Sequence, residues 1–209
     1  MTPSVMLARH SVEELAKAVG GTLVRSGKPK RFCGITADSR SVRPGDAFFC
    51  LQGESEDGHR YAPHASARGA TVIVVKKDVP IPTVPPHSCV VRVEDPLEAM
   101  TDWAAHCRKV LKGPVIGITG SNGKTTVKEM IASILACAAG GAHRVLKSRG
   151  NFNTEIGLAI TLADAAPSHR FAVLEMAMRG PGQIRRLART ARPNVGVITS
   201  IGPAHLARL

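Results

Sequence analysis

The stretch most informative about the fold reads Val115-Ile116-Gly117-Ile118-Thr119-Gly120-Ser121-Asn122-Gly123-Lys124-Thr125-Thr126. The apolar residues predict a buried strand, the glycines predict a turn, and a helix is expected to begin at Lys124. A strand, a glycine turn and a helix in this order form the layout of a phosphate-binding loop. A turn that binds nothing is the alternative, but Gly-Lys-Thr in this context favours a nucleotide triphosphate site.

The residue types of this loop suit a polyphosphate. Gly120 and Gly123 allow the backbone to lie against phosphate groups, and the helix N-terminus adds partial positive charge. The side chain of Lys124 can reach the β- and γ-phosphates, and the Thr125 hydroxyl can ligate Mg²⁺. One position departs from the general pattern, because Ile118 stands where a glycine is usual.

Composition and length place the chain among ordinary globular proteins. Its 209 residues allow one large or two small domains, and an apolar fraction of 44% supports a real core. The five cysteines are scattered and never form Cys-x-x-Cys, so we expect reduced and mostly buried thiols. The sequence contains neither a signal-peptide pattern nor an apolar run long enough for a membrane span, so a cytoplasmic location is expected.

The net charge of +12 makes nucleic acid the first partner to consider. Aromatic residues form only 3% of the chain, so platforms for stacking bases are scarce. The basic residues are also dispersed, and the densest group, Arg185 to Arg192, is expected to be a solvated helix face. We therefore expect no nucleic acid partner, and a small anionic ligand suits the surface equally well.

The pattern along the chain predicts two α/β domains, 1–112 and 113–209. Ser11 to Glu14 form a capping box for a first helix, and a longer helix is expected from Pro96 to about Leu111. Lys112-Gly113-Pro114 then marks the boundary. In the first domain, strands are expected near residues 23–24, 35–37, 47–51, 71–75 and 89–93, with a helix over 62–68.

The second domain is expected to contain a parallel sheet covered on both faces by helices. Strands are predicted at 115–119, 144–146, 171–176 and 195–200, and helices are expected to begin near Lys124, Thr154 and Gly182. Ligands of such sheets bind outside the carboxyl ends of the strands. The loop, Glu175 and His205 should therefore lie at one edge of the sheet.

Three segments near this edge have more than one interpretation. Glu175 is either a strand-end acid that faces water or a magnesium ligand that faces the triphosphate. His205 is either a polar surface residue or a metal ligand. In the run Gly150 to Gly157, Asn153 is either a helix N-cap or, like Asn151, an amide that binds a polar substrate.

These motifs together resemble the Mur ligase family, the ATP-dependent enzymes that form amide bonds in peptidoglycan precursor synthesis. The family's ATP loop takes the form Thr-Gly-x-Asn-Gly-Lys-Thr, which fits Thr119–Thr125 and explains the absent early glycine. Further matching stretches are Asp38-Ser39-Arg40 with Pro44–Phe49 and Asp57-Gly58-His59, Gly150–Gly157, Glu175–Gly180, and Thr199–Leu206. The last two favour the MurF type over the sibling ligase that adds the third peptide residue.

The resemblance implies both a fold and a reaction. A small UDP-binding α/β domain would precede an incomplete P-loop domain with a parallel sheet that binds ATP. ATP would phosphorylate the carboxylate of UDP-N-acetylmuramoyl-tripeptide, and the amine of D-alanyl-D-alanine would attack the acyl phosphate. A monomer is expected for the full-length ligase. The identity of the third peptide residue stays open.

The resemblance also assigns roles to residues. It implies catalytic roles for Lys124, Glu175 and His205, and metal-ligand roles for Thr125, Glu175 and His205. ATP would bind to Thr119, Gly120, Ser121, Asn122, Gly123, Lys124, Thr125 and Thr126. The substrate would bind to Asp38, Ser39, Arg40, Asn151, Asn153 and Thr154.

Some features depart from the family. Ala177 replaces a usual Gly, and Ser200 and Thr154 replace a usual Asn. Because family members continue into a further domain, we expect the chain to be a fragment that is poorly soluble and has no ligase activity alone. A degenerate nucleotide-binding module without ligation is the competing interpretation.

Overall fold

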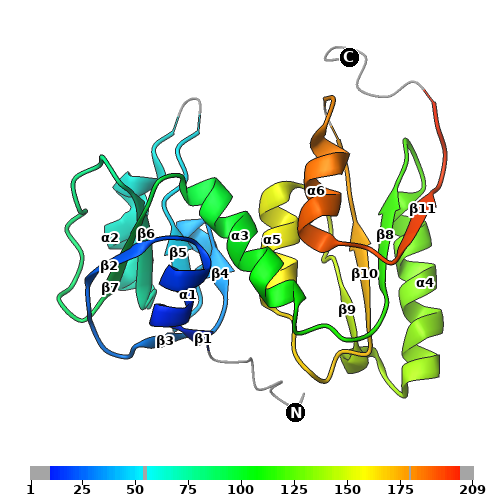
Figure 1. Ribbon diagram of the computed structural model, residues 1–209, viewed down its shortest axis with the longest axis horizontal. Helices are drawn as coiled ribbons and strands as arrows, with labels where there is room; N and C mark the ends of the chain where they lie inside the picture. The colour runs from blue at the N-terminus through cyan, green and yellow to red at the C-terminus, as the bar shows by residue number, and fades with distance from the viewer. Residues whose placement is uncertain (1–9, 54–55, 179, 203–209) are drawn as a thin grey trace. The chain divides into compact units, whose positions relative to one another are not determined.

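The computed structural model describes residues 10–53, 56–178 and 180–202 and divides into two compact units (Figure 1). Unit 1 extends to Trp103 and unit 2 begins at Ala104. The division falls within helix α3 (Pro96–Arg108). The domain boundary at residues 112–113 stays a prediction.

Unit 1 is built on a five-stranded sheet with the strand order β2-β7-β6-β5-β4. Strand β2 pairs with β7 in the antiparallel direction, and the other pairs are parallel. Its strands are β1 (His10–Ser11), β2 (Thr22–Arg25), β3 (Arg31–Phe32), β4 (Ile35–Thr36), β5 (Ala47–Phe49), β6 (Val72–Lys76) and β7 (Cys89–Val93). Its other helices are α1 (Val12–Ala18), α2 (Ala62–Ala67) and the 3₁₀ helices η1 (Ser39–Ser41) and η2 (Gly58–Tyr61). The short β1–β3 pair was not predicted from the sequence.

The helix ends of unit 1 follow local chemistry. The Ser11 hydroxyl accepts a hydrogen bond from the backbone N–H of Glu14 at 3.3 Å, which confirms the predicted N-cap. At α3, the Asp95 carboxylate accepts from the N–H groups of Leu97 and Glu98. The predicted end near Leu111 was wrong, because residues 109–111 donate to carbonyls three residues back and the α-helix ends at Arg108.

Unit 2 contains a fully parallel sheet with the strand order β11-β8-β10-β9. The strands are β8 (Val115–Thr119), β9 (Val145–Lys147), β10 (Phe171–Glu175) and β11 (Val195–Ile198). The helices are α4 (Lys124–Ala139), α5 (Glu155–Ala163), α6 (Gln183–Ala191) and the 3₁₀ helix η3 (Ala142–Arg144). This architecture confirms the predicted α/β class.

Helices cover both faces of this sheet (Figure 1). Helix α4 packs on β8, β9 and β10, while α6 packs against β8 and contacts α5. Ile118, Val173 and Ala132 are buried in the core between α4 and the sheet. Because all four strands are parallel, their carboxyl ends meet at one edge, and every loop that leaves this edge follows a strand.

Four strands end earlier than predicted. Strand β4 ends at Thr36 rather than at residue 37, and β5 ends at Phe49 rather than at residue 51. Strand β10 ends at Glu175 rather than at residue 176, and β11 ends at Ile198 rather than at residue 200. After β11, the Thr199 N–H still donates to the Thr119 carbonyl of β8, while the hydroxyl groups of Thr199 and Ser200 hydrogen-bond to the glycine loop.

The cysteines agree with the sequence prediction. All are free thiols, of which Cys50, Cys89 and Cys107 are buried. Burial raises the pKa of the Cys50 thiol far above its ordinary value, so this residue is an inert part of the core. Within the described ranges, no helix is both long and apolar enough to cross a membrane.

Candidate functional site

The glycine loop of residues 120–123 connects β8 to α4 and has the backbone of a phosphate-binding loop. Gly120 and Gly123 have φ angles of 137° and 79°, in the left-handed region that L side chains rarely adopt. Gly123 also occupies the N-cap position of α4 and supplies no side chain to cap the first turn. The N-terminus of a 16-residue helix therefore faces the loop with its backbone donors, as an anion site requires.

Residues 199–202 after β11 brace this loop. The Thr199 hydroxyl donates to the Asn122 carbonyl, and the Asn122 N–H donates to Ser200 Oγ at 3.0 Å. Ser121 Oγ donates to the Gly202 carbonyl at 2.8 Å. The space beside Gly120 is filled, since a Cβ atom there would lie 2.3 Å from Thr199 Oγ1. The loop conformation therefore depends on a distant part of the sequence.

Lys124 folds back over the loop at the start of α4. Its Nζ donates to the carbonyl oxygens of Gly120 at 2.6 Å and Ser121 at 3.0 Å. These bonds hold the ammonium beside the backbone donors of the helix terminus. The arrangement presents a fixed positive charge to an anionic ligand.

Glu175 lies at the carboxyl end of β10, and its side chain is 2% exposed. Its Oε2 accepts a hydrogen bond from the Thr125 hydroxyl at 3.0 Å, and its Oε1 accepts from Asn153 Nδ2 at 2.9 Å. Its backbone N–H donates to Ser148 Oγ at 3.1 Å. The alternative of a water-facing acid is therefore wrong, and the carboxylate is held toward the first turn of α4.

The asparagine segment lies beside this carboxylate. The N-cap of α5 is Thr154, whose hydroxyl accepts from the Gly157 N–H at 3.4 Å, so the interpretation of Asn153 as N-cap was wrong. Asn153 instead donates to Glu175, and its carbonyl accepts from the Ala177 N–H. Asn151 is exposed next to it.

Lys128 was missed in the sequence analysis. It lies one turn after Lys124 on α4, is fully buried, and its Nζ is 3.4 Å from Glu175 Oε2. A signal was present, because helical spacing places residue 128 on the same face as Ala132, a core residue. A lysine on a buried helix face requires a partner, and Glu175 is the acid that provides it.

The oxygen atoms at this edge fit a magnesium ion. Thr125 Oγ1 and Glu175 Oε2 are hard ligands at the mouth of the phosphate loop, and Mg²⁺ in nucleotide sites takes one or two protein oxygens together with phosphates and water. Across the residues that the structure describes, no group of three His, Cys, Asp or Glu side chains could hold a metal by itself. The phosphates of a nucleotide would have to supply further ligands.

Of the other residues predicted at this edge, the structure describes Thr119 and Thr126 but not His205. Thr119 ends β8, and Thr126 is exposed in the first turn of α4. His205 lies outside the described residues. The structure thus brings the loop, Lys124, Thr125, Glu175 and Asn153 together.

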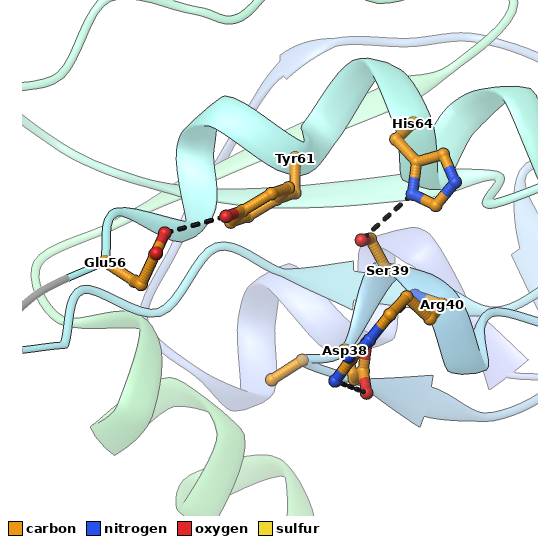
Figure 2. A pocket seen from close by; sticks show the side chains of 7 residues that line it. Asp38, Ser39, Arg40, Glu56, Tyr61 and His64 are labelled. Atoms are coloured by element: carbon orange, nitrogen blue, oxygen red, sulfur yellow. Dashed lines mark hydrogen bonds and ion pairs between the residues drawn. The ribbon is translucent and has the colours of Figure 1, made fainter.

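Unit 1 contains a cavity of about 620 Å³ at the carboxyl ends of β4 and β5 (Figure 2). It is lined by Ala37, Asp38, Ser39, Arg40, Glu56, Tyr61 and His64. The three residues predicted to bind substrate in this unit therefore share one cavity. Glu56, Tyr61 and His64 were missed, although Tyr61 is the single tyrosine of a chain poor in aromatic residues.

Charged pairs shape the wall of this cavity, as Figure 2 shows. Arg40 Nε and Nη2 donate to the two carboxylate oxygens of Asp38 at 2.9 and 3.0 Å. The Arg40 side chain lowers the pKa of Asp38 and keeps it ionised. The Tyr61 hydroxyl donates to Glu56 at 2.7 Å, which raises the pKa of the tyrosine. His64 Nδ1 and Ser39 Oγ are hydrogen-bonded at 3.0 Å.

His59 has a structural role near this cavity. Its Nε2 accepts from the Lys76 N–H at 3.0 Å, so the ring proton is on Nδ1, which donates to Asp57 at 2.6 Å. The backbone N–H of His59, followed by its ring, lowers the pKa of Asp57. The hydrogen bonds of His59 in the motif Asp57-Gly58-His59 therefore connect η2 to β6.

Comparisons with known proteins match both units. A model described as "Mur ligase family, catalytic domain" matches residues 31–108, and the model of the Mur ligase middle domain matches residues 118–209. The chain belongs to the Mur ligase family. The first match includes the cavity residues, and the second includes the glycine loop.

Individual relatives within the Mur ligase family share this arrangement. The UDP-N-acetylmuramoyl-tripeptide–D-alanyl-D-alanine ligase of Synechocystis is 45% identical over 86% of this chain and 38% of the relative. The crystal structure of MurF from Acinetobacter baumannii superposes with a TM-score of 0.85 at 32% identity, over 97% of this chain and 43% of that one. MurF ligase from Thermotoga maritima, solved in complex with ADP, gives a TM-score of 0.69 at 32% identity. The match covers 83% of this chain and 38% of that one. The chain thus spans about two fifths of the length of these Mur ligases.

Proposed function

We propose that the chain provides the ATP-binding and nucleotide-sugar-binding parts of a ligase that joins D-alanyl-D-alanine to UDP-N-acetylmuramoyl-tripeptide. The observation that carries this proposal is the meeting of Lys124, Thr125 and the buried Glu175 at one sheet edge. The relatives named as such ligases support the choice of substrates. A cytoplasmic location and a monomeric ligase are parts of the same proposal.

In the proposed reaction, a carboxylate oxygen of the tripeptide attacks the γ-phosphorus of ATP, and ADP leaves. The amine nitrogen of D-alanyl-D-alanine then attacks the acyl carbon, and phosphate leaves from the tetrahedral intermediate. Lys124 and the backbone donors of residues 123–125 would stabilise the negative charge of the transferring phosphoryl group. Bound Mg²⁺ would neutralise further phosphate charge.

The residues proposed to hold Mg²⁺ are Thr125 and Glu175, with His205 as a further ligand. Asn153 keeps the Glu175 carboxylate in place through its amide and leaves Oε2 directed toward Thr125. Asn151 and Thr154 are proposed to contact the substrate from the same segment. We propose that Asn151, Asn153 and Thr154 lie beside the position where the acyl phosphate would form.

The cavity of unit 1 is proposed to bind the nucleotide-sugar part of the substrate. Its volume lies within the range of small-molecule sites, about 300–1,000 Å³. Arg40 offers a solvent-facing guanidinium for phosphate groups, and Tyr61 offers an aromatic surface. Asp38 and Ser39 complete the proposed contacts.

Calorimetric titration of the chain with ADP and Mg²⁺ tests the nucleotide site. Lys124→Ala is expected to weaken ADP binding about ten- to hundredfold, because it removes a charged hydrogen-bond donor. The thermal melt should be unchanged, since Lys124 is only partly buried. Lys112→Ala, an exposed lysine at the other end of β8, is the matched control.

A second titration, with UDP-N-acetylmuramoyl-tripeptide, tests the cavity of unit 1. Wild-type chain and Lys124→Ala should bind this ligand equally well. Undiminished ADP affinity in Lys124→Ala would reject the loop as the nucleotide site, and lack of any binding by the tripeptide nucleotide would reject the substrate assignment.

A further inference from the structure

Lys128 is a fully buried cation beside the proposed nucleotide site. Its side chain is 0% exposed, although it extends from the same helix as the partly exposed Lys124. An ammonium group removed from water requires acceptors and a negative partner within the protein. The contacts of Nζ therefore show which negative charge this ammonium group balances.

Three acceptors surround the Lys128 ammonium. Nζ donates to the Gly150 carbonyl at 3.1 Å, and it lies 3.4 Å from both Glu175 Oε2 and Glu129 Oε1. Glu129 is half exposed and also binds Lys147, so its charge is already shared and screened by water. Glu175 is buried as deeply as Lys128 and is the principal charge that the ammonium balances.

One carboxylate oxygen of Glu175 contacts both Thr125 and Lys128. Glu175 Oε2 accepts a hydrogen bond from the Thr125 hydroxyl, and it also lies 3.4 Å from the Lys128 ammonium. A divalent cation bound between Thr125 and Glu175 would therefore sit within a few ångströms of a fixed positive charge. Like charges at such separations repel strongly where water is excluded.

We propose that Lys128 is the built-in counter-ion of Glu175 and makes divalent-cation binding at Thr125 and Glu175 depend on the phosphates of the nucleotide. Free Mg²⁺ meets a carboxylate whose charge is already balanced. The polyphosphate adds negative charge that outweighs the ammonium, so the metal binds together with the nucleotide. This inference rests on the proposed function, since Glu175 as metal ligand is part of it.

The experiment uses Mn²⁺ as a spectroscopic probe and measures its binding to the chain by electron paramagnetic resonance, with and without ATP. Without ATP, Lys128→Met is expected to bind Mn²⁺ about tenfold more tightly than wild type, because it removes the repelling charge. This gain in Mn²⁺ affinity should vanish in the double variant Lys128→Met/Glu175→Gln. Lys147→Met removes a lysine from the exposed Glu129 pair and should show no gain.

Two further measurements keep the test decisive if Lys128→Met does not fold. Lys128→Gln removes the charge but keeps a donor for the Gly150 carbonyl, and it should show the same gain. In wild type, Mn²⁺ should bind much more tightly with ATP than without it. Equal Mn²⁺ affinity of wild type with and without ATP would overturn the proposal.

The remaining outcomes separate this proposal from the proposed function. If Glu175→Gln weakens Mn²⁺ binding in the presence of ATP but neither Lys128 variant gains affinity in its absence, the counter-ion role is wrong and the metal ligand stands. If Glu175→Gln leaves Mn²⁺ binding with ATP unchanged, Glu175 is not a metal ligand, and both proposals lose their support.

Discussion

The phosphate loop of unit 2 and the cavity of unit 1 both follow the carboxyl ends of parallel strands, but they are built from different groups. The loop site uses backbone donors, glycines with positive φ and an acid that is 2% exposed. The cavity uses side chains at the surface, such as Arg40, whose side chain is 84% exposed. One site is therefore fixed by backbone shape and burial, and the other by charged side chains in water.

This difference bears on how each site responds to change. A buried network with a constrained backbone has few ways to relax, so a small substitution at one of its glycines or buried side chains should disturb fold and binding together. Solvent-facing pairs contribute little to stability, so substitutions there should alter binding alone. Three predictions test this contrast.

The largest effect is expected from Gly120→Ala in unit 2. The new Cβ would lie 2.3 Å from Thr199 Oγ1, at a φ of 137° that only glycine adopts readily. We expect a loss of about 2–4 kcal/mol in the free energy of unfolding, measured by urea denaturation, together with loss of ADP binding.

Gly123→Ala provides the matched comparison for this prediction. Its φ of 79° is also left-handed, but the nearest atom to a new Cβ is Thr199 Cβ at 3.9 Å. The free energy of unfolding is expected to fall by only about 1 kcal/mol. Equal losses of unfolding free energy in the two glycine variants would show that the packing of Thr199 against the loop does not contribute to stability.

A smaller and more selective effect is expected from Arg40→Ala in unit 1. It should weaken binding of UDP-N-acetylmuramoyl-tripeptide about tenfold, through loss of a charged donor, leave ADP affinity unchanged, and lower the melting temperature far less than Gly120→Ala does. Arg68→Ala, an exposed arginine after α2, controls for the change in net charge. A fall in melting temperature for Arg40→Ala as large as that for Gly120→Ala would contradict the contrast between the two sites.

The smallest effect concerns pH and the Asp38–Arg40 pair. The Arg40 side chain lowers the pKa of Asp38 in the folded state. The pair therefore stabilises the fold fully above the ordinary aspartate value of about 3.9, and this contribution is lost as pH falls through the lowered pKa.

Comparison of wild type with Asp38→Asn would measure this contribution. The difference in unfolding free energy should be small and constant from about pH 8 to pH 5, and it should vanish at lower pH as the carboxylate takes up its proton. A difference that grows on acidification would have the wrong sign and would reject the pair as its source.

The sequence predicted the strand, glycine loop and helix start of unit 2 well because their chemistry is local. Strand β8, the loop and the start of α4 are contiguous, and their apolar run, glycines and lysine each have a direct structural meaning. The parallel sheet then brought Glu175 to the same edge, as the rule for such sheets predicts. The bounds of β8 agreed with the prediction at both ends.

The parts that were missed depend on packing between distant segments. Apart from its helical spacing to Ala132, Lys128 has the sequence context of an ordinary helix lysine, and the approach of β10 and the Gly150 carbonyl shows that it is buried. Tyr61 and Glu56 join Arg40 in a cavity because β4 and β5 are neighbours, which the short strand signals did not reveal. The N-cap at α5 was misassigned because adjacent Asn153 and Thr154 are both good caps.

The bracing of the phosphate loop also has a consequence for the order of events during synthesis of the chain. Ser121 and Gly202 hydrogen-bond to each other although they are 81 positions apart. At ordinary elongation rates, the loop sequence would wait about 4–16 seconds for this partner to be made. A nascent chain that has not yet released residue 202 from the ribosome would carry the nucleotide motif in full and still lack the braced loop that gives the motif its shape.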